Sequence, residues 1–89
     1  MHFEWDDDKN LVNLAKHHVS FYEAQLAFAD PQRVIARDIG HSEGEERYYC
    51  FGKVQGGVLT VRFTYRSDAI RIIGAGYWRK GKAVYEAKN

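Results

Sequence analysis

The chain has 89 residues, of which 45% are hydrophobic, 15% aromatic and 28% charged, and its formal net charge is +1. This length leaves room for a single domain with one core over residues 1–89, and the composition is that of a folded globule and not of a disordered tail. Because no apolar stretch approaches the roughly 20 residues that span a bilayer, and the first residues do not resemble a signal peptide, we expect a cytoplasmic protein.

The start of the chain predicts a short strand followed by a helix. Residues 2–5 alternate, with Phe3 and Trp5 on one side, which favours a brief edge strand. Three aspartates at positions 6–8 then precede the apolar residues of a helix. Carboxylates near the free N–H groups of a first turn stabilise a helix, so we interpret the aspartates as a cap and not as a metal site.

A second, shorter helix is expected directly after the first. Ser20 and Glu23 have the spacing of a capping box, in which each side chain bonds the backbone N–H of the other residue. Phe21 and Phe28 share one face, and Asp30-Pro31 should end the helix because proline has no N–H donor. Two helices joined by a tight turn could indicate a DNA-binding helix-turn-helix, but their residues are acidic or apolar, which disfavours phosphate contacts.

The pattern from Arg33 onward is that of strands. Strands are expected over residues 34–36, 48–51, 58–65 and 69–75, with tight connections at Gly56-Gly57 and residues 66–68. This order is typical of an antiparallel meander, and residues 83–87 are expected to form a last helical turn. The predicted fold class is α+β: two N-terminal helices packed on an antiparallel sheet of about four strands, with a short C-terminal helical turn.

Alternation within the strands assigns the two faces of the sheet. Leu59 and Val61 point to the core, so Arg62 lies on the open face, and the same parity turns Arg71 to that side. Ile73 points outward by this count and breaks the pattern. Cys50 sits in an apolar run and is interpreted as a small buried hydrophobe and not as a nucleophile.

Charge is divided unevenly along the chain. Residues 1–30 carry six acidic side chains against Lys9 and Lys16, whereas residues 31–89 carry eleven Lys and Arg against six acids. In the basic half these cations are interleaved with Tyr and Trp. Cations neutralise phosphates and aromatic rings stack on unpaired bases, so the mixture favours single-stranded nucleic acid over duplex. The alternative is an ordinary solvated sheet face with aromatic residues in the core.

The sequence restricts the chemistry that this half of the chain could perform. It has no Ser-His-Asp spacing, glycine-rich phosphate loop or metal motif, and too few ligands for a structural zinc site. What remains is a metal-free reaction on a phosphodiester, in which a protein base takes the 2′-hydroxyl proton and arginines stabilise charge on phosphorus. Histidine titrates near neutral pH, so His41 is the natural acid or base. Its alternative is a loop residue bonded to Glu43 or Glu45.

Short motifs that run nearly from end to end of the chain occur together in one known family. They are Phe3-Glu-Trp-Asp6, Lys9-Asn10, Asn13-Leu14, Lys16-His17, Val19-Ser20-Phe21, Phe28, Asp30-Pro31, residues 41–47, Gly52, Thr64, Arg66 and Arg71-Ile-Ile73. In this order they resemble the BrnT family, the toxin half of a bacterial type II toxin–antitoxin pair. The resemblance implies a single toxin-like domain with a RelE-like fold.

The resemblance also implies an activity and partners. The expected activity is that of an endoribonuclease that cleaves RNA without a metal or other cofactor and thereby inhibits translation. A cognate antitoxin protein should neutralise the toxin, and the complex should bind its operator DNA through the antitoxin. An alternative function is that of a catalytically weak or inactive antitoxin-binding protein that acts mainly in operator autoregulation.

Three site residues, Lys53, Arg66 and Arg71, match basic positions of the family. The residues expected to be catalytic are Lys53, Arg66, Tyr77 and Arg79, with Tyr77 as a stacking or proton-transfer group, and those expected to bind RNA are Arg62, Arg71 and Lys80. The chain departs from the family after Arg71-Ile-Ile73, because Gly76 stands where the family typically has an arginine. Arg79 or Lys80 is expected to substitute for that arginine. The glycines nearby predict a shortened or displaced final helix.

Overall fold

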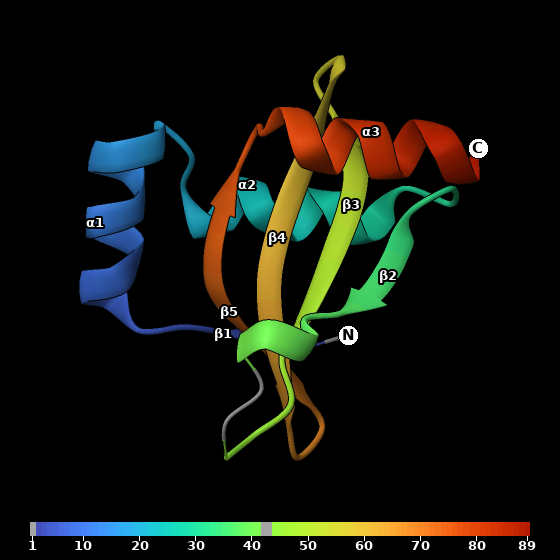
Figure 1. Cartoon of the computed structure of the whole chain (residues 1–89). Coiled ribbons are helices and arrows are strands. Elements are labelled where there is room, and N and C mark those ends of the chain that lie inside the picture. The colour runs from blue at the N-terminus through green and yellow to red at the C-terminus, as the bar shows by residue number, and fades with distance from the viewer. Residues whose placement is uncertain (1, 42–43) are drawn as a thin grey trace.

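Within residues 2–41 and 44–89, which the computed structural model describes, the strands form one five-stranded mixed sheet (Figure 1). The strands are β1 (His2–Glu4), β2 (Val34–Arg37), β3 (Tyr48–Val54), β4 (Gly57–Arg66) and β5 (Ala69–Gly76), and their order in the sheet is β1-β5-β4-β3-β2. The four expected antiparallel strands are all present. The prediction of a wholly antiparallel sheet of about four strands is wrong in one respect. The sheet has a fifth strand, β1, which pairs with β5 in parallel.

The helices lie on both faces of the sheet and at one edge of it. They are α1 (Asp7–His17), α2 (Phe21–Ala24), its 3₁₀ continuation η1 (Gln25–Ala29), the short 3₁₀ turn η2 (Ile39–His41) and α3 (Arg79–Lys88). The Asp6 cap is confirmed, since Asp6 Oδ1 accepts from Asp8 N and Lys9 N at 2.9 and 3.1 Å. The capping box is confirmed on its Ser20 side, where Ser20 Oγ accepts from Glu23 N at 3.1 Å, while the Glu23 carboxylate accepts from Tyr77 Oη. No helix of the described residues is long and apolar enough to cross a membrane.

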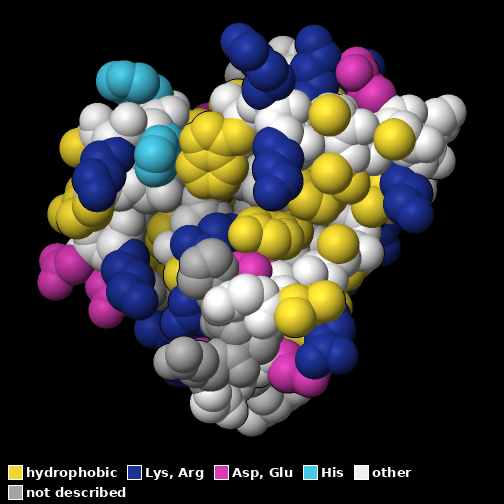
Figure 2. Space-filling model, in the orientation of Figure 1, with side chains coloured by type: hydrophobic (Ala, Val, Ile, Leu, Met, Phe, Trp, Pro, Cys, Tyr) yellow, Lys and Arg dark blue, Asp and Glu magenta, His cyan; other side chains and the backbone are white. Residues whose placement is uncertain are grey.

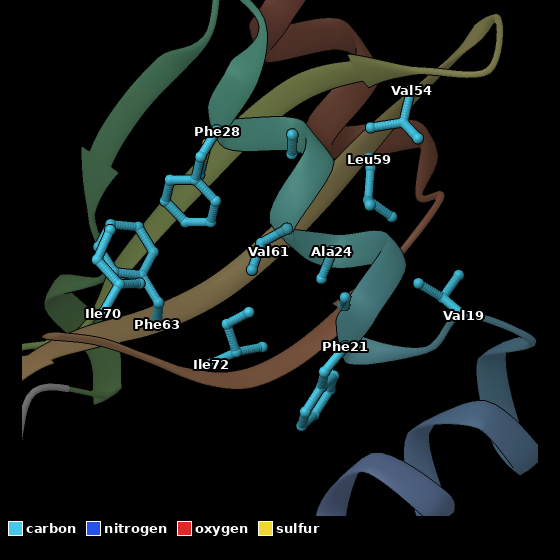
Figure 3. Packing of buried hydrophobic residues seen from close by; sticks show 13 residues of the cluster. Val19, Phe21, Ala24, Phe28, Val54, Leu59, Val61, Phe63, Ile70 and Ile72 are labelled. Atoms are coloured by element: carbon cyan, nitrogen blue, oxygen red, sulfur yellow. The ribbon is translucent and has the colours of Figure 1, made fainter. Parts of the chain in front are cut away.

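The first core fills the space between α2–η1 and the sheet (Figure 3). Its largest fully buried side chains include Phe21, Leu59, Phe63 and Ile72. Cys50 is completely buried among them, and burial raises the pKa of its thiol to about 12, in accord with the predicted inert hydrophobe. The core face assigned from strand alternation is therefore confirmed.

The final helix is longer than predicted and packs on the opposite face of the sheet. In place of one turn, α3 spans Arg79–Lys88 and buries Tyr85 against Phe51 and Val58. Gly81 allows this contact, because a Cβ at this position would collide with Thr60 Oγ1. The glycine therefore brings the start of the helix onto the sheet and does not break it.

The placement of α1 differs from the prediction that both N-terminal helices pack on the sheet. This helix stands beside the β5 edge (Figure 1) and leaves Leu11, Val12 and Leu14 exposed by 62, 54 and 44%. Its buried residue is Asn13, whose Nδ2 donates to Val19 O and Ala75 O at 2.9 Å each and whose Oδ1 accepts from Ala75 N at 3.1 Å. The amide thus makes the pair of hydrogen bonds that another strand would make to β5, and so covers its edge.

A β-bulge explains the outward position of Ile73. Arg62 pairs with Gly74, but the next residue of β4, Phe63, pairs with Ile72, so Ile73 is the extra residue of β5. Bulges bend a strand and change the direction in which side chains point. Ile72 therefore stays in the core while Ile73 and Gly74 both lie on the side of Arg62.

Asp30 links three elements at the end of η1. Its Oδ2 accepts from Tyr85 Oη at 2.6 Å and from Lys53 N at 2.7 Å, and its Oδ1 accepts from Gln32 N at 2.9 Å. The hydrogen bond from Tyr85, followed by those from the backbone, lowers the pKa of the Asp30 carboxyl. The carboxylate therefore stabilises the fold above its unfolded pKa, near 4, and this contribution is lost as pH falls through the lower folded value.

We expect Asp30→Asn to lower the free energy of unfolding by about 1 kcal/mol at pH 7, because a neutral amide accepts these hydrogen bonds more weakly. The difference in unfolding free energy between the variant and the unchanged protein should shrink below pH 4, because Asp30 itself then becomes protonated and loses its charge. Urea unfolding followed by circular dichroism between pH 7 and pH 2.5 measures both effects. The control is Asp68→Asn in the exposed β4–β5 turn, and equal behaviour of the two variants would contradict the role of Asp30.

Candidate functional site

The candidate site lies on the face of the sheet that α3 covers only in part. There β4 and β5 present Arg62, Arg71, Ile73 and Gly74, which we call the open face. Figure 2, in the orientation of Figure 1, shows Lys and Arg side chains intermixed with hydrophobic ones between α1 on the left and α3 across the top. The open face is thus bordered by the first and the last helix of the chain, α1 and α3.

Arg62 lies at the centre of the open face. Its side chain is 29% exposed, and its Nη2 lies 3.8 Å from Oδ2 of Asp38, whose side chain is 7% exposed. Arg62 Nε is buried and has no hydrogen-bond partner in the described part of the structure. Burial, and then the negative charge of Asp38, raise the pKa of Tyr49 beside this pair. The guanidinium is thus held by one carboxylate but retains donor capacity.

One hollow of about 300 Å³ lies between the start of α3 and the sheet. Its lining is mostly aromatic and aliphatic, with two cations at its border. The lining residues are Tyr49, Phe51, Thr60, Arg62, Trp78, Lys80, Gly81 and Val84. An apolar hollow with a few polar groups is the usual form of a ligand site.

A second hollow of about 310 Å³ lies between α1 and β5 and shares Arg62 and Trp78 with the first. From α1 it receives Lys9, Lys16 and His17, together with Asp8. The positive charge of the site is therefore not confined to the basic half of the sequence. Sequence reasoning missed these α1 residues, although Lys9 and Lys16 are seven residues apart and so lie on the same side of a helix.

The three residues expected to bind RNA all belong to this side of the sheet. Arg62 and Lys80 line the first hollow. Arg71 pairs with Thr64 across the strands, and its Nη1 lies 3.1 Å from Glu4 Oε2 of β1. Arg62 and Lys80 thus lie together, whereas Arg71 shares the face but lines neither hollow and is in an ion pair.

The four residues expected to be catalytic are not brought together. Lys53 borders a separate hollow with Lys82 and Tyr85, near the other end of α3. Arg66 lies at the far end of β4, eight residues after Val58, which is the partner of Lys53. At the usual rise per strand residue this separates Lys53 from Arg66 by about 26 Å. Arg66 Nη2 lies 3.3 Å from Glu45 Oε1. Arg79 is the exposed first residue of α3.

Tyr77 points away from the open face. Its hydroxyl donates to Glu23 Oε2 on α2 at 2.6 Å, and its ring lies against Gly57. Burial and the hydrogen bond to Glu23 raise the pKa of Tyr77 to about 12. A proton-transfer role at neutral pH is thus disfavoured at this position.

Trp78 occupies the space above Gly76. Gly76 pairs with Thr60 and so faces the side of Arg62, and a Cβ there would lie 2.5 Å from Cε2 and Cζ2 of the indole. The ring of His17 meets the indole edge-on, at 5.2 Å between centroids and an interplanar angle of 88°. Position 76, where the family that this sequence resembles typically has an arginine, is therefore a glycine covered by the indole of Trp78.

Two sequence expectations concern acid–base and metal chemistry. The side chain of His41 lies outside the described residues, as do Ser42 and Glu43, so the acid or base role of His41 stays a prediction. Among the side chains that the structure does describe, no three or more His, Cys, Asp or Glu gather where they could hold a metal ion. His17 is the described imidazole that lines a hollow of the open face.

Comparison with known proteins adds one match. A family model described as "Ribonuclease toxin, BrnT, of type II toxin-antitoxin system" matches residues 5–81. No curated protein matches the chain. The matched span extends from Trp5 through Gly81 and so includes α1, the open face and the start of α3.

Proposed function

This chain belongs to the BrnT family of ribonuclease toxins of type II toxin–antitoxin systems, and we propose that it cleaves RNA on the open face of its sheet. The observation that carries the proposal is the position of Arg62. It borders both hollows, and its guanidinium is oriented by a buried carboxylate. Such a preorganised donor suits a phosphate whose charge grows during reaction.

The surroundings of Arg62 fit a single-stranded polyanion. Lys80 approaches from α3, and Lys9 and Lys16 approach from α1, so cations flank Arg62 on two sides. The aromatic ring of Trp78 lies between these groups. Lysines neutralise phosphates without regard to sequence, and aromatic rings accept unpaired bases, which is how single strands are commonly bound.

The proposed reaction is attack of the ribose 2′-oxygen on the adjacent phosphorus. The bond from phosphorus to the 5′-oxygen breaks, leaving a 2′,3′-cyclic phosphate and a free 5′-hydroxyl. The 2′-hydroxyl loses one proton and the leaving oxygen gains one. Arg62 stabilises the charge on phosphorus, and His17, which borders the same hollow, carries the proton. No metal ion takes part in this sequence of bonds.

We expect the purified full-length protein, free of antitoxin, to degrade single-stranded RNA in buffer with EDTA, because the reaction above uses only protein groups. Gel analysis of the fragments should show 5′-hydroxyl ends and 2′,3′-cyclic phosphate ends. The matched control is the same RNA with 2′-O-methyl groups, which cannot provide the nucleophile. Intact RNA after incubation with folded protein in EDTA would overturn the proposal.

In the cell, we propose that this cleavage acts on RNA in the cytoplasm and inhibits translation. A cognate antitoxin protein neutralises the toxin, as membership of a type II system implies. Through that antitoxin the complex binds its operator DNA. The support for these steps is the family match alone.

The covered position at Gly76 favours a second candidate function. The cation that the resembling family has there is absent, and Trp78 fills its place. The protein would then cleave RNA weakly, if at all, and act mainly by binding its antitoxin in operator autoregulation. The EDTA assay separates the two functions, because the second predicts RNA that stays intact or nearly so with folded protein.

A further inference from the structure

The hollow between α3 and the sheet has aromatic walls that fit a flat ring. Tyr49 and Phe51 stack with 5.6 Å between centroids and an interplanar angle of 24°, and Trp78 forms another part of the lining. The volume of about 300 Å³ is at the lower end of the range of small-molecule sites. It suits one planar group and not a base pair.

Polar atoms of this hollow lack partners within the described structure. Thr60 is 3% exposed, and its buried Oγ1 makes no hydrogen bond. The same holds for the buried Nε of Arg62, which also lines the hollow. Both atoms are covered by neighbouring protein atoms, and a Cβ on Gly81 would collide with the Thr60 hydroxyl. A ligand in the hollow would therefore meet the aromatic rings and the outer part of the Arg62 side chain, which is 29% exposed, and not these two atoms.

Two glycines shape this hollow. Gly81 lets the start of α3 approach Thr60, and Gly76 lets the indole of Trp78 lie on β5. Trp78 and Lys80 are thereby held at the border of the hollow beside Arg62. An aromatic ring and two cations at one entrance match the alternation of base and phosphate in a single strand.

We propose that this hollow binds one unpaired nucleobase of the RNA substrate, with Tyr49, Phe51 and Trp78 against its ring. The proposal rests on the proposed RNA cleavage for the identity of the ligand. Lys80 and Arg62 bind the phosphates on either side of that nucleotide. The enzyme therefore selects RNA whose base is free to leave a stack.

The test measures binding of a short single-stranded oligoribonucleotide that carries 2′-O-methyl groups and so cannot be cleaved. Trp5→Phe leaves Trp78 as the one tryptophan of the chain, which makes its fluorescence specific for the hollow. We expect the oligonucleotide to quench this fluorescence. A version with abasic positions has the same phosphates and should bind at least about tenfold more weakly, because base stacking on aromatic rings is lost.

Trp78→Ala removes the reporting tryptophan, so its binding is followed by fluorescence anisotropy of a dye-labelled oligonucleotide. This variant should bind the normal oligonucleotide more weakly by a similar factor and the abasic one with unchanged affinity. Tyr22→Ala removes an aromatic side chain that is 65% exposed on α2 and serves as the control, with unchanged binding expected.

Equal affinity for normal and abasic oligonucleotides would overturn the base site, even if the protein cleaves RNA in EDTA. Unchanged affinity of the Trp78→Ala variant would do the same. Base-dependent binding without any cleavage would instead support the base site and contradict the proposed ribonuclease reaction. The two proposals therefore fail in different experiments.

Discussion

Replacement of Arg62 by alanine should lower the rate of RNA cleavage by two to three powers of ten, roughly the effect of removing one preorganised transition-state donor. The reason is geometric, because Arg62 borders both hollows and Asp38 lies 3.8 Å from its guanidinium. Arg62→Lys keeps the charge but lacks the planar set of donors, so it should recover only part of the rate. Single-turnover cleavage of a labelled RNA, with folding checked by circular dichroism, measures these effects.

The control for Arg62 is Arg37→Ala. Arg37 is a surface arginine of β2 whose Nη2 lies 2.6 Å from Glu46 Oε1, and it lines neither hollow of the open face. Its replacement should leave cleavage within a factor of about two, which corresponds to less than 0.5 kcal/mol. Full activity of Arg62→Ala, with activity lost in Lys53→Ala or Arg66→Ala, would place the reaction at the residues expected from sequence and contradict the open face.

Replacement of Asn13 by alanine should lower the free energy of unfolding by about 3 kcal/mol. The change leaves Val19 O and both backbone groups of Ala75 without the amide that pairs them, in a buried position. It also releases α1 from the β5 edge, and with it Lys9 and Lys16, so affinity for RNA should fall as well. Urea unfolding measures stability, and fluorescence titration with the uncleavable oligonucleotide measures affinity.

Leu14→Ala is the matched control on the same helix. Leu14 is larger and more hydrophobic than Asn13, yet it is 44% exposed, so its loss should cost well under 1 kcal/mol. Asn13→Asp gives a further check, because a carboxylate cannot donate to Val19 O and Ala75 O. If Leu14→Ala proves more harmful than Asn13→Ala, then apolar contacts and not the amide hold α1 in place.

The comparison of Asn13 with Leu14 shows why the position of α1 could not be predicted. The helix has apolar residues and a good cap, and on local grounds its apolar residues should be buried. In the structure these residues stay exposed while a polar residue is buried, because the β5 edge has backbone groups to pair. The need to pair the backbone N–H and C=O of Ala75 arises only after β5 has taken its place in the sheet.

The candidate site also combines a feature that the sequence predicts with features that depend on packing between distant elements. Alternation along β4 correctly placed Arg62 on the open face, since the direction of a side chain in a strand is a local property. The proximity of Lys16, Arg62 and Lys80 depends on how α1 and α3 pack, and no local pattern contains that information. Lys53 and Arg66 are both basic residues of one hairpin, but the length of β4 keeps them apart.

The sequence by itself therefore determined the Asp6 and Ser20 caps, the core face of β4 and the buried thiol of Cys50, and its ordered motifs indicated the family. The first three follow from residue type and short-range spacing, which act within a turn or a strand. Only the tertiary structure decided the parallel pairing of β1 with β5, the bulge at Ile73 and the meeting of α1 with α3 around Arg62. Their physical cause is packing between residues distant in sequence, where glycines at 76 and 81 set how closely Trp78 and α3 approach the sheet.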